Sequence, residues 1–401
     1  MSLRILQVLT PALHPNRGGV QMSTVKLARY FSSREIDNAV FSFAASGHAP
    51  PECLRLFSAK EPGGTKRANN AYELQSTLRT FDPHIVINHM PYEERIGSVL
   101  SADSRPYVLL ACLRNTLFSV KGDLESFIKA TTPRLAWPAL LNRTGKKLIL
   151  ARHRHRHAGQ LRRILDTYDR FVMFGPPNLD ELRYFVPEFD PDRIALIPNS
   201  IPAVATSVPE KQKRILWLGR VARAQKRVEL IPEIWSRTLA RLPDWRLDIV
   251  GDGPDLEWLK ARVHSMGLER ISFHGRQVPD SYFARSAIFL MTSSFEGFPN
   301  TLVEAQSQGA VPVIFDSYPV ARWIVENGAN GWLVEPFDIE AMSRKLVELA
   351  ESSDLPEMGA AAIQSARRFL IDNVGLRWEA LFNEELGKRA QPQIGLGSSN
   401  A

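Results

Sequence analysis

The sequence has few cysteines, no long apolar run and no complete dinucleotide-binding fingerprint, and each shortage excludes a class of protein. Its 401 residues include two cysteines, Cys53 and Cys112, so we expect no disulfide framework, and a reducing cytosol is the simpler compartment. No apolar run approaches the ~20 residues of a membrane span, and no signal peptide is recognisable. We therefore expect a cytoplasmic protein, either soluble or peripheral on the cytoplasmic face of a membrane.

The glycine pattern argues against a Rossmann oxidoreductase. Such an enzyme needs G-x-G-x-x-G after its first strand and an acidic residue about 20 residues later. The first strand, Arg4–Leu9, is followed by a loop whose glycines are only Gly18 and Gly19. Small glycines at the start of a helix still allow a phosphate to approach backbone N–H groups, although an ordinary turn is the alternative.

Positive charge is concentrated in the first half of the chain. Residues 1–200 hold 27 Lys/Arg against 18 Asp/Glu, whereas residues 201–401 hold 23 against 25. Nine of these cations lie in Arg143–Arg170, which we expect to form a basic helix over Lys146–Asp169. Such a surplus suits anionic lipid or an anionic acceptor, and a solvated surface is an equal alternative. The segment lacks interleaved aromatics and any known module, so we expect no nucleic-acid partner.

Two successive series of strands and helices predict an α/β protein. Short apolar runs such as Tyr107–Cys112 and Arg214–Leu218 are typical of buried parallel strands. The series are separated by a proline-rich stretch, which predicts two doubly wound, Rossmann-like domains. The expected divisions are a first domain at 1–197, a linker at 198–209, a second domain at 210–373, a helix at 374–388 packing back on the first domain, and a disordered tail at 389–401.

The strongest candidate site runs from Glu296 to Glu304. A Gly-Phe-Pro turn precedes a helix that Asn300 or Thr301 would cap. The free N–H groups at such a helix start, together with the helix dipole, suit a diphosphate. The two carboxylates should approach one cleft and accept hydrogen bonds from sugar hydroxyls. The alternative is that Glu296 is solvated and Glu304 only favours the helix dipole.

A second candidate follows the strand that ends at Leu218. Gly219 allows a turn close to a ligand, and Arg220 and Lys226 should project from the carboxyl edge of the sheet. Two fixed cations there would stabilise a diphosphate leaving group as it gains charge. A solvated basic loop is the alternative.

These segments resemble glycosyltransferase family 4, whose members are retaining enzymes of the GT-B fold with an E-x7-E motif. Residues 296–304 match that motif, and Arg220 and Lys226 match the family's G-R-x5-K pair. The resemblance implies two Rossmann-like domains facing across a cleft. It also implies a nucleoside-diphosphate sugar as donor, with UDP or GDP expected, and no cofactor or obligatory metal. The acceptor would be lipid-linked or a saccharide, in cell-envelope polysaccharide, lipopolysaccharide or glycolipid synthesis.

The resemblance also assigns roles to residues. Glu296 would contact the donor sugar and Glu304 the ribose, while the first domain would hold the acceptor. Closure across the linker would exclude water. The implied donor-binding set is Gly18, Gly19, Arg276, Gln277, Phe298, Pro299, Asn300, Thr301, Leu302 and Glu304.

One departure from the family concerns the catalytic machinery. Many members carry a histidine where this chain has Leu113-Arg114-Asn115. Arg114 or Asn115 would then substitute, or His89 would face the cleft instead, although a lone histidine is more often structural. A catalytically altered GT-B-like protein that binds nucleotide sugars is the alternative function.

Two patterns mimic metal sites. Asp190-Pro191-Asp192 has the D-x-D form of metal-dependent transferases, but the neighbouring prolines indicate a surface turn. His153, His155 and His157 alternate, and residues two apart on a helix point in different directions. We expect no metal site.

Overall fold

The computed structural model describes residues 2–10, 12–13, 18–44, 54–59, 68–101 and 105–390. Cys53 and the tail from residue 391 lie outside the described residues, so the predictions about them stay untested. Cys112 is a free, buried thiol. Burial raises the pKa of this thiol to about 11, so it stays protonated near neutral pH.

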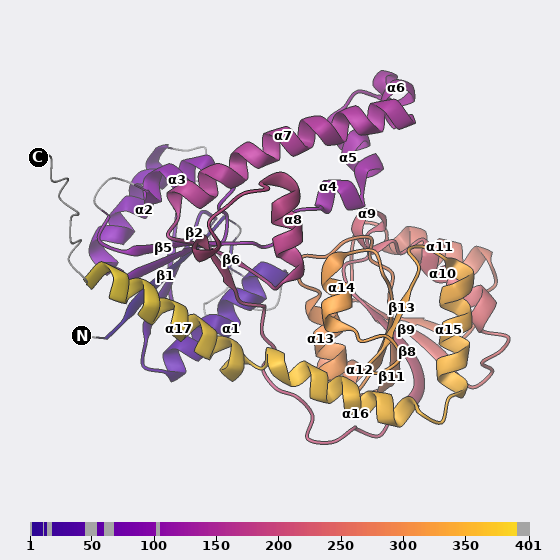
Figure 1. The fold of residues 1–401 in the computed structure, drawn as a ribbon. Coiled ribbons are helices and arrows are strands. Elements are labelled where there is room, and N and C mark those ends of the chain that lie inside the picture. Colours follow the sequence, from indigo (N-terminus) through magenta and orange to yellow (C-terminus); the bar gives the residue numbers. More distant parts are fainter. Residues whose placement is uncertain are drawn as a thin grey trace, which may run out of the picture.

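The first domain is built on a seven-stranded sheet, shown on the left of Figure 1. All its strands are parallel, in the order β3-β2-β1-β4-β5-β6-β7. The strands are β1 (Arg4–Leu9), β2 (Asp37–Ser42), β3 (Arg55–Ser58), β4 (Ile85–Asn88), β5 (Val108–Cys112), β6 (Arg170–Met173) and β7 (Ile194–Leu196). The helices are α1 (Gly19–Ser33), α2 (Ala68–Phe81), α3 (Glu94–Leu100), α4 (Ser119–Gly122), α5 (Leu124–Thr131), α6 (Trp137–Leu141), α7 (Arg143–Thr167) and α8 (Pro177–Phe185).

The second domain repeats this plan with six parallel strands in the order β10-β9-β8-β11-β12-β13. They are β8 (Gln212–Leu218), β9 (Arg246–Val250), β10 (Ile271–Phe273), β11 (Ser286–Met291), β12 (Val311–Phe315) and β13 (Trp332–Val334). The helices that follow in the chain are α9 (Arg223–Lys226), α10 (Leu230–Thr238), α11 (Leu256–Ser265), α12 (Asp280–Arg285), α13 (Asn300–Ser307), α14 (Pro319–Ile324), α15 (Ile339–Glu351), α16 (Leu355–Ala366) and α17 (Ile371–Ala390).

The predicted fold class is confirmed, since both sheets are parallel and doubly wound. Some predicted bounds were wrong. The basic helix begins at Arg143 rather than at Lys146, because the side chain of Asn142 caps it by accepting a hydrogen bond from the Gly145 N–H. The last helix begins at Ile371 rather than at residue 374, directly after the bridge that pairs Ile201 with Leu370.

That bridge joins the two places where the chain crosses between the domains. The N–H of Ile201 donates to Phe369 O at 2.9 Å, and the N–H of Ile371 donates back to Ile201 O at 2.9 Å. The outgoing linker and the returning segment therefore run side by side as one hinge.

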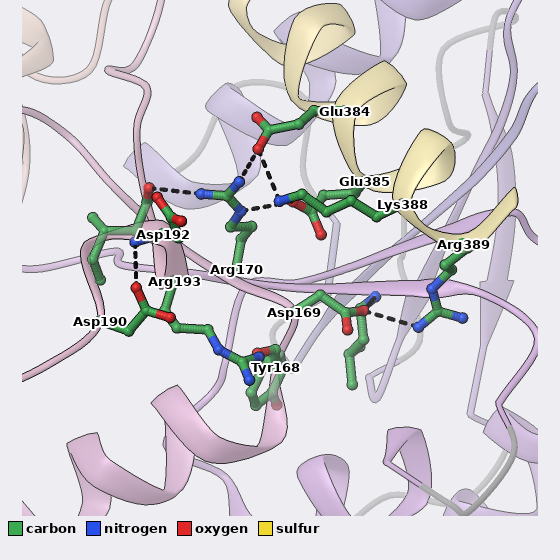
Figure 2. A network of polar contacts seen from close by, with 12 residues as sticks. Tyr168, Asp169, Arg170, Asp190, Asp192, Arg193, Glu384, Glu385, Lys388 and Arg389 are labelled. Carbon is green, nitrogen blue, oxygen red and sulfur yellow. Dashed lines mark hydrogen bonds and ion pairs between the residues drawn. The ribbon is translucent and has the colours of Figure 1, made fainter. Parts of the chain in front are cut away.

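Helix α17 covers the first domain. The Phe382 ring packs on Phe31 of α1, with ring centroids 5.7 Å apart. Arg170 of β6 donates to Glu385 at 2.7 Å and also contacts Glu384, as Figure 2 shows. The Arg170 and Glu385 side chains are only 7% and 8% exposed. This buried pair fixes the end of the chain to the sheet.

Breaking that pair should destabilise the first domain. Replacing Arg170 by methionine leaves the Glu385 carboxylate buried, with Lys388 as its remaining ion-pair partner. We expect a loss of about 3 kcal/mol in the free energy of unfolding, measured by urea denaturation. Arg389→Met is the control, because Arg389 pairs with Asp169 at a more exposed position and should cost less than about 1 kcal/mol. Equal losses of unfolding free energy in the two variants would contradict the stabilising role of the Arg170–Glu385 pair.

Candidate functional site

The first part of the site comes from neighbouring strands of the second sheet. Glu296 lies in the loop after β11, and Lys226 lies in α9 after β8, which pairs with β11. The Lys226 ammonium donates to the Glu296 carboxylate at 2.6 Å, and Gln225 donates to it at 3.3 Å. Glu296 is 7% exposed, so this ion pair is largely shielded from bulk water. The structure thus brings these two predicted residues into direct contact.

Arg220 lies at the same edge of the sheet. Its side chain is exposed and makes no hydrogen bond or ion pair within the described residues. A Cβ on the preceding Gly219 would lie 3.5 Å from the Lys226 Cε. The backbone just before Arg220 therefore adjoins the Lys226 side chain. Arg220 is therefore available to an anionic ligand.

The start of α13 differs from the prediction. Pro299 occupies the N-cap position, and no side chain caps the helix. Asn300 is the first helical residue, and its Oδ1 accepts a hydrogen bond from Asn199 Nδ2 at 3.1 Å. The expectation that Asn300 or Thr301 caps the helix was wrong. Pro299 is at the N-cap, and the Asn300 side chain is hydrogen-bonded to Asn199 of the hinge instead. The N–H of Thr301 has no intramolecular partner among the described residues.

Glu304 lies one turn into α13 and reaches across to the first domain. Its carboxylate accepts from Lys26 of α1 at 2.9 Å, with both side chains under one-fifth exposed. Lys26 also donates to the carbonyl of Ser200 in the hinge at 3.3 Å. Sequence reasoning missed Lys26, because a single lysine in an amphipathic helix carries no motif.

The glycine loop of the first domain faces the start of α13. Gly18 has φ +70°, a conformation that favours glycine. A Cβ on Gly19 would lie 3.3 Å from Asn300 Nδ2. The starts of α1 and α13, which come from different domains, are therefore in close contact.

His89 and Arg114 form a buried polar pair beside the hinge. His89 is 1% exposed, and its Nε2 lies 3.0 Å from Gln7 Oε1 while its Nδ1 accepts from the Arg114 guanidinium. This pattern assigns the neutral Nε2–H tautomer, since Arg114 only donates. Burial, followed by the charge of Arg114, lowers the pKa of His89 well below its usual range. The expectation that His89 faces the cleft was wrong, because both ring nitrogens are engaged beneath Arg114.

A chain of hydrogen bonds continues from this pair to the second domain. Arg114 donates to Asn199 Oδ1 at 3.2 Å, and Asn199 in turn donates to Asn300. Ser23 of α1 also donates to Asn199 Oδ1, at 3.0 Å. Asn199 therefore connects Arg114, α1 and α13, and sequence reasoning identified it only as part of the hinge.

Two predicted donor residues point elsewhere. The Phe298 ring lies against Phe174 of the first domain and against Phe369 of the hinge, with centroids 5.7 and 5.3 Å apart. Leu302 is fully buried in the same core cluster. Both side chains are therefore engaged in apolar packing, and their predicted part in donor binding stays a prediction.

Arg276 and Gln277 are exposed at the edge of the second sheet. They follow β10, the outermost strand, and Gln277 donates to the carbonyl of His274 at 3.0 Å. Gly251 allows the neighbouring loops to pack, because a Cβ there would lie 1.8 Å from the Gly219 carbonyl oxygen.

The two domains approach each other closely at two glycines. A Cβ on Gly297 would lie 2.7 Å from the Asn115 Cα, and a Cβ on Gly175 would lie 2.6 Å from the Trp323 ring. Beside these contacts lies an open cavity of about 730 Å³, lined by both domains, including Thr116, Phe118, Phe295, Tyr318 and Trp323. Phe295, the residue before Glu296, is part of its lining.

The metal-like patterns have structural explanations. Asp190 caps a short turn by accepting from the Asp192 N–H, and both residues are exposed. His153 and His157, one turn apart, stack on each other at 5.2 Å and pack against Phe185. Within the described ranges, no three His, Cys, Asp or Glu side chains gather in a way that could hold a metal.

Comparisons with known proteins agree with this architecture. Residues 203–369 match the family described as Glycosyl transferases group 1. A lipopolysaccharide 1,6-galactosyltransferase of Salmonella typhimurium is 35% identical over 152 residues, which cover 36% of this chain and 42% of that protein. A GDP-mannose:cellobiosyl-diphosphopolyprenol alpha-mannosyltransferase of Komagataeibacter xylinus is 26% identical over 295 residues, covering 67% and 72%.

The likeness in structure extends over nearly the whole chain. The apo form of the lipopolysaccharide outer core galactosyltransferase WaaB superposes with a TM-score of 0.69 at 18% identity, covering 96% of this chain and all of that one. The chain spans less than half the length of the first curated relatives that it matches. This chain therefore has the GT-B fold, and its residues 203–369 carry the sequence pattern of the Glycosyl transferases group 1 family.

Proposed function

We propose that this chain is a retaining glycosyltransferase, which moves a sugar from a nucleoside-diphosphate sugar to a hydroxyl acceptor. The proposal is supported by contacts around residues 296–304: Lys226 donates to Glu296, Glu304 accepts from Lys26 of α1, and a Cβ on Gly19 would lie 3.3 Å from Asn300 Nδ2. Carboxylates, an ammonium group and glycine backbone are the groups that a sugar joined to a diphosphate requires. The family matched by the second domain supports the same chemistry.

The second domain would hold the donor. Arg220, Lys226 and the N–H of Thr301 bind the diphosphate and stabilise the charge that it gains as its bond to the sugar breaks. Glu296 accepts hydrogen bonds from the sugar, and Glu304 accepts them from the ribose in exchange for Lys26. No metal is required in this scheme, because protein cations balance the phosphate charge.

The acceptor hydroxyl would attack the anomeric carbon from the face that the diphosphate leaves. The bond from that carbon to the diphosphate oxygen breaks, the bond to the acceptor oxygen forms, and the acceptor proton passes to a diphosphate oxygen. Attack on the departing face retains the anomeric configuration. No carboxylate base is needed beside the acceptor.

Arg114 would replace the histidine of related enzymes. The structure surrounds it with His89 and Asn199, two neutral partners, and no carboxylate pairs with it among the described residues. Its charge is therefore free to stabilise an anionic or hydroxyl group near the reacting carbon. His89 and Asn199 would act as positioning residues that hold the guanidinium in place.

The acceptor would be a saccharide or a lipid-linked saccharide. The names of the two relatives described above specify lipopolysaccharide and a diphosphopolyprenol carrier. The cavity lined by Phe118, Phe295 and Tyr318 carries aromatic rings together with hydroxyl groups, a combination that suits a sugar. We infer a role in cell-envelope polysaccharide, lipopolysaccharide or glycolipid synthesis on the cytoplasmic face of a membrane.

A catalytically altered protein that only binds nucleotide sugars is the second candidate, favoured by Arg114 in place of histidine. The two candidates differ in one measurement. Incubation with radiolabelled nucleotide sugars and a mixed saccharide or lipid acceptor yields labelled product only if transfer occurs. Nucleotide binding without label in any acceptor would favour the second candidate.

Donor binding is tested by thermal denaturation with UDP, GDP, ADP and dTDP. A nucleotide present at about 100 times its Kd stabilises the folded form by about 2.7 kcal/mol, which should raise Tm by several degrees. Arg220→Ala and Glu304→Gln should abolish that shift. Glu351→Gln, at the end of α15, should keep it. Each variant is compared with its own ligand-free Tm. A protein that responds to none of the four nucleotides would overturn the proposal.

A further inference from the structure

The inserted helices between β5 and β6 form a protrusion. We define it as residues 124–157, which span α5, α6 and the first half of α7. Figure 1 shows α6 and the start of α7 standing away from both sheets. With 25 residues, α7 is about 37 Å long, and the residues from its second half that pack on the first domain are Ala158, Leu161, Ile164 and Leu165.

The protrusion is locally well held together. Lys146 of α7 pairs with Glu125 of α5 at 2.6 Å. Gly145 allows close packing, because a Cβ there would lie 2.2 Å from the carbonyl oxygen of Ala139 in α6. The Trp137 indole donates to the carbonyl of Thr132 at 3.3 Å. These contacts make the protrusion a rigid platform rather than a loose loop.

The net charge of the protein is located in this protrusion. Residues 124–157 hold eight Lys/Arg against one Asp/Glu, a net charge of +7, which equals the formal net charge of the whole chain. All other residues together sum to zero. Arg143, Lys147, Arg152 and Arg156 are exposed and make no ion pair within the described residues.

The same protrusion exposes large apolar side chains. Leu135 is 97% exposed and Leu148 is 66% exposed, and they are two of six such side chains in the described residues. Trp137 lies between them in sequence and is half-buried, with the Lys129 and Arg134 cations near its ring. Leucine and tryptophan beside a cluster of lysine and arginine is the composition of a surface that enters the interface of an anionic bilayer.

We propose that residues 124–157 dock the protein on an anionic phospholipid surface, with Leu135 and Leu148 inserted and the basic side chains on the headgroups. This proposal differs from the expectation for Arg143–Arg170 in its bounds, because the second half of α7 packs on the first domain. A nucleic acid would use the charge but gain nothing from exposed leucines. The described helices include none long and apolar enough to span a bilayer.

Co-sedimentation of the full chain with vesicles tests the proposal without donor or acceptor, so its outcome is separate from that of the proposed transferase. Binding to phosphatidylcholine vesicles with roughly 30% phosphatidylglycerol should exceed binding to pure phosphatidylcholine. The triple variant Arg143→Gln, Lys147→Gln, Arg152→Gln should weaken it on the order of a hundredfold, since each charge contributes about a factor of five. The matched control is Arg241→Gln, Arg246→Gln, Arg377→Gln, three exposed arginines elsewhere, which should bind almost as the parent does.

A second pair of variants separates membrane docking from general polyanion binding. Leu135→Ser with Leu148→Ser should weaken vesicle binding at least tenfold while leaving retention on a heparin column unchanged. Leu376→Ser with Val278→Ser replaces two exposed apolar side chains elsewhere and should change neither. Equal vesicle binding by the variants of the protrusion and their controls would overturn the proposal. Full vesicle affinity in the Leu135→Ser, Leu148→Ser variant would overturn it too. Circular dichroism confirms that each variant is folded.

Discussion

Replacing Lys226 by methionine is expected to lower kcat for sugar transfer by a factor of about 100 to 1,000. The reason is that the ammonium beside Glu296 would stabilise charge that develops only in the transition state. KM for the donor should rise less, because in the proposed scheme Arg220 and the start of α13 would still hold the diphosphate. The measurement is the steady-state rate of nucleoside-diphosphate release with acceptor present.

The controls separate chemistry from folding. Lys345→Met removes another partly buried, ion-paired lysine of the second domain, and its kcat should stay within a factor of two or so of the parent. Lys226→Arg keeps the charge and should recover part of the lost rate. If Lys226→Met had full activity while remaining folded, the diphosphate role of this lysine would be rejected.

Replacing Gly297 by alanine should reduce kcat/KM about a hundredfold by holding the two domains apart. The added Cβ would lie 2.7 Å from the Asn115 Cα and 3.2 Å from the Arg114 carbonyl oxygen. These are backbone atoms, which cannot rotate away, and a displacement near 1 Å at a reacting centre costs about that factor. The backbone of Gly297 is not left-handed, so strain within the loop does not confuse the result.

Gly159→Ala is the matched control for this substitution. Gly159 lies in α7, and a Cβ there would meet nothing within 4 Å. Alanine should leave the activity unchanged and stabilise the helix by up to about 1 kcal/mol. Small-angle scattering with the nucleotide bound should show a larger radius of gyration for Gly297→Ala than for the parent. Full activity together with an unchanged radius would show that closure does not depend on this contact.

The elements that form the second domain's share of the site could be predicted from the sequence. Short apolar runs followed by a turn and a helix give parallel strands, and ligands bind at the carboxyl edge of such sheets. That rule places the loops after β8 and β11 at one edge, and Lys226 indeed contacts Glu296 there. The roles of these residues in transfer remain predictions.

The contacts between the domains could not be predicted. Lys26, Asn199 and Trp323 are ordinary residues in sequence terms, and each acquires its partner only when the two sheets face each other. Phe298 illustrates the converse, since its place in the motif suggested a ligand contact while its ring packs against Phe174. A motif indicates which residue type occurs at a turn. The contacts of its side chain depend on the residues that the opposite domain places against it.

The two α/β domains, and the acidic and basic residues that follow β8 and β11, could be predicted from the sequence, because hydrophobic periodicity and turn residues act over short stretches of chain. The cations of residues 124–157 are evident there too. The pairing of Glu304 with Lys26, the contact of Arg114 with a neutral His89 and the exposure of Leu135 beside those cations all arise from the folded arrangement of the chain. Burial and pairing depend on residues far away in the chain, so they exist only once the domains have packed.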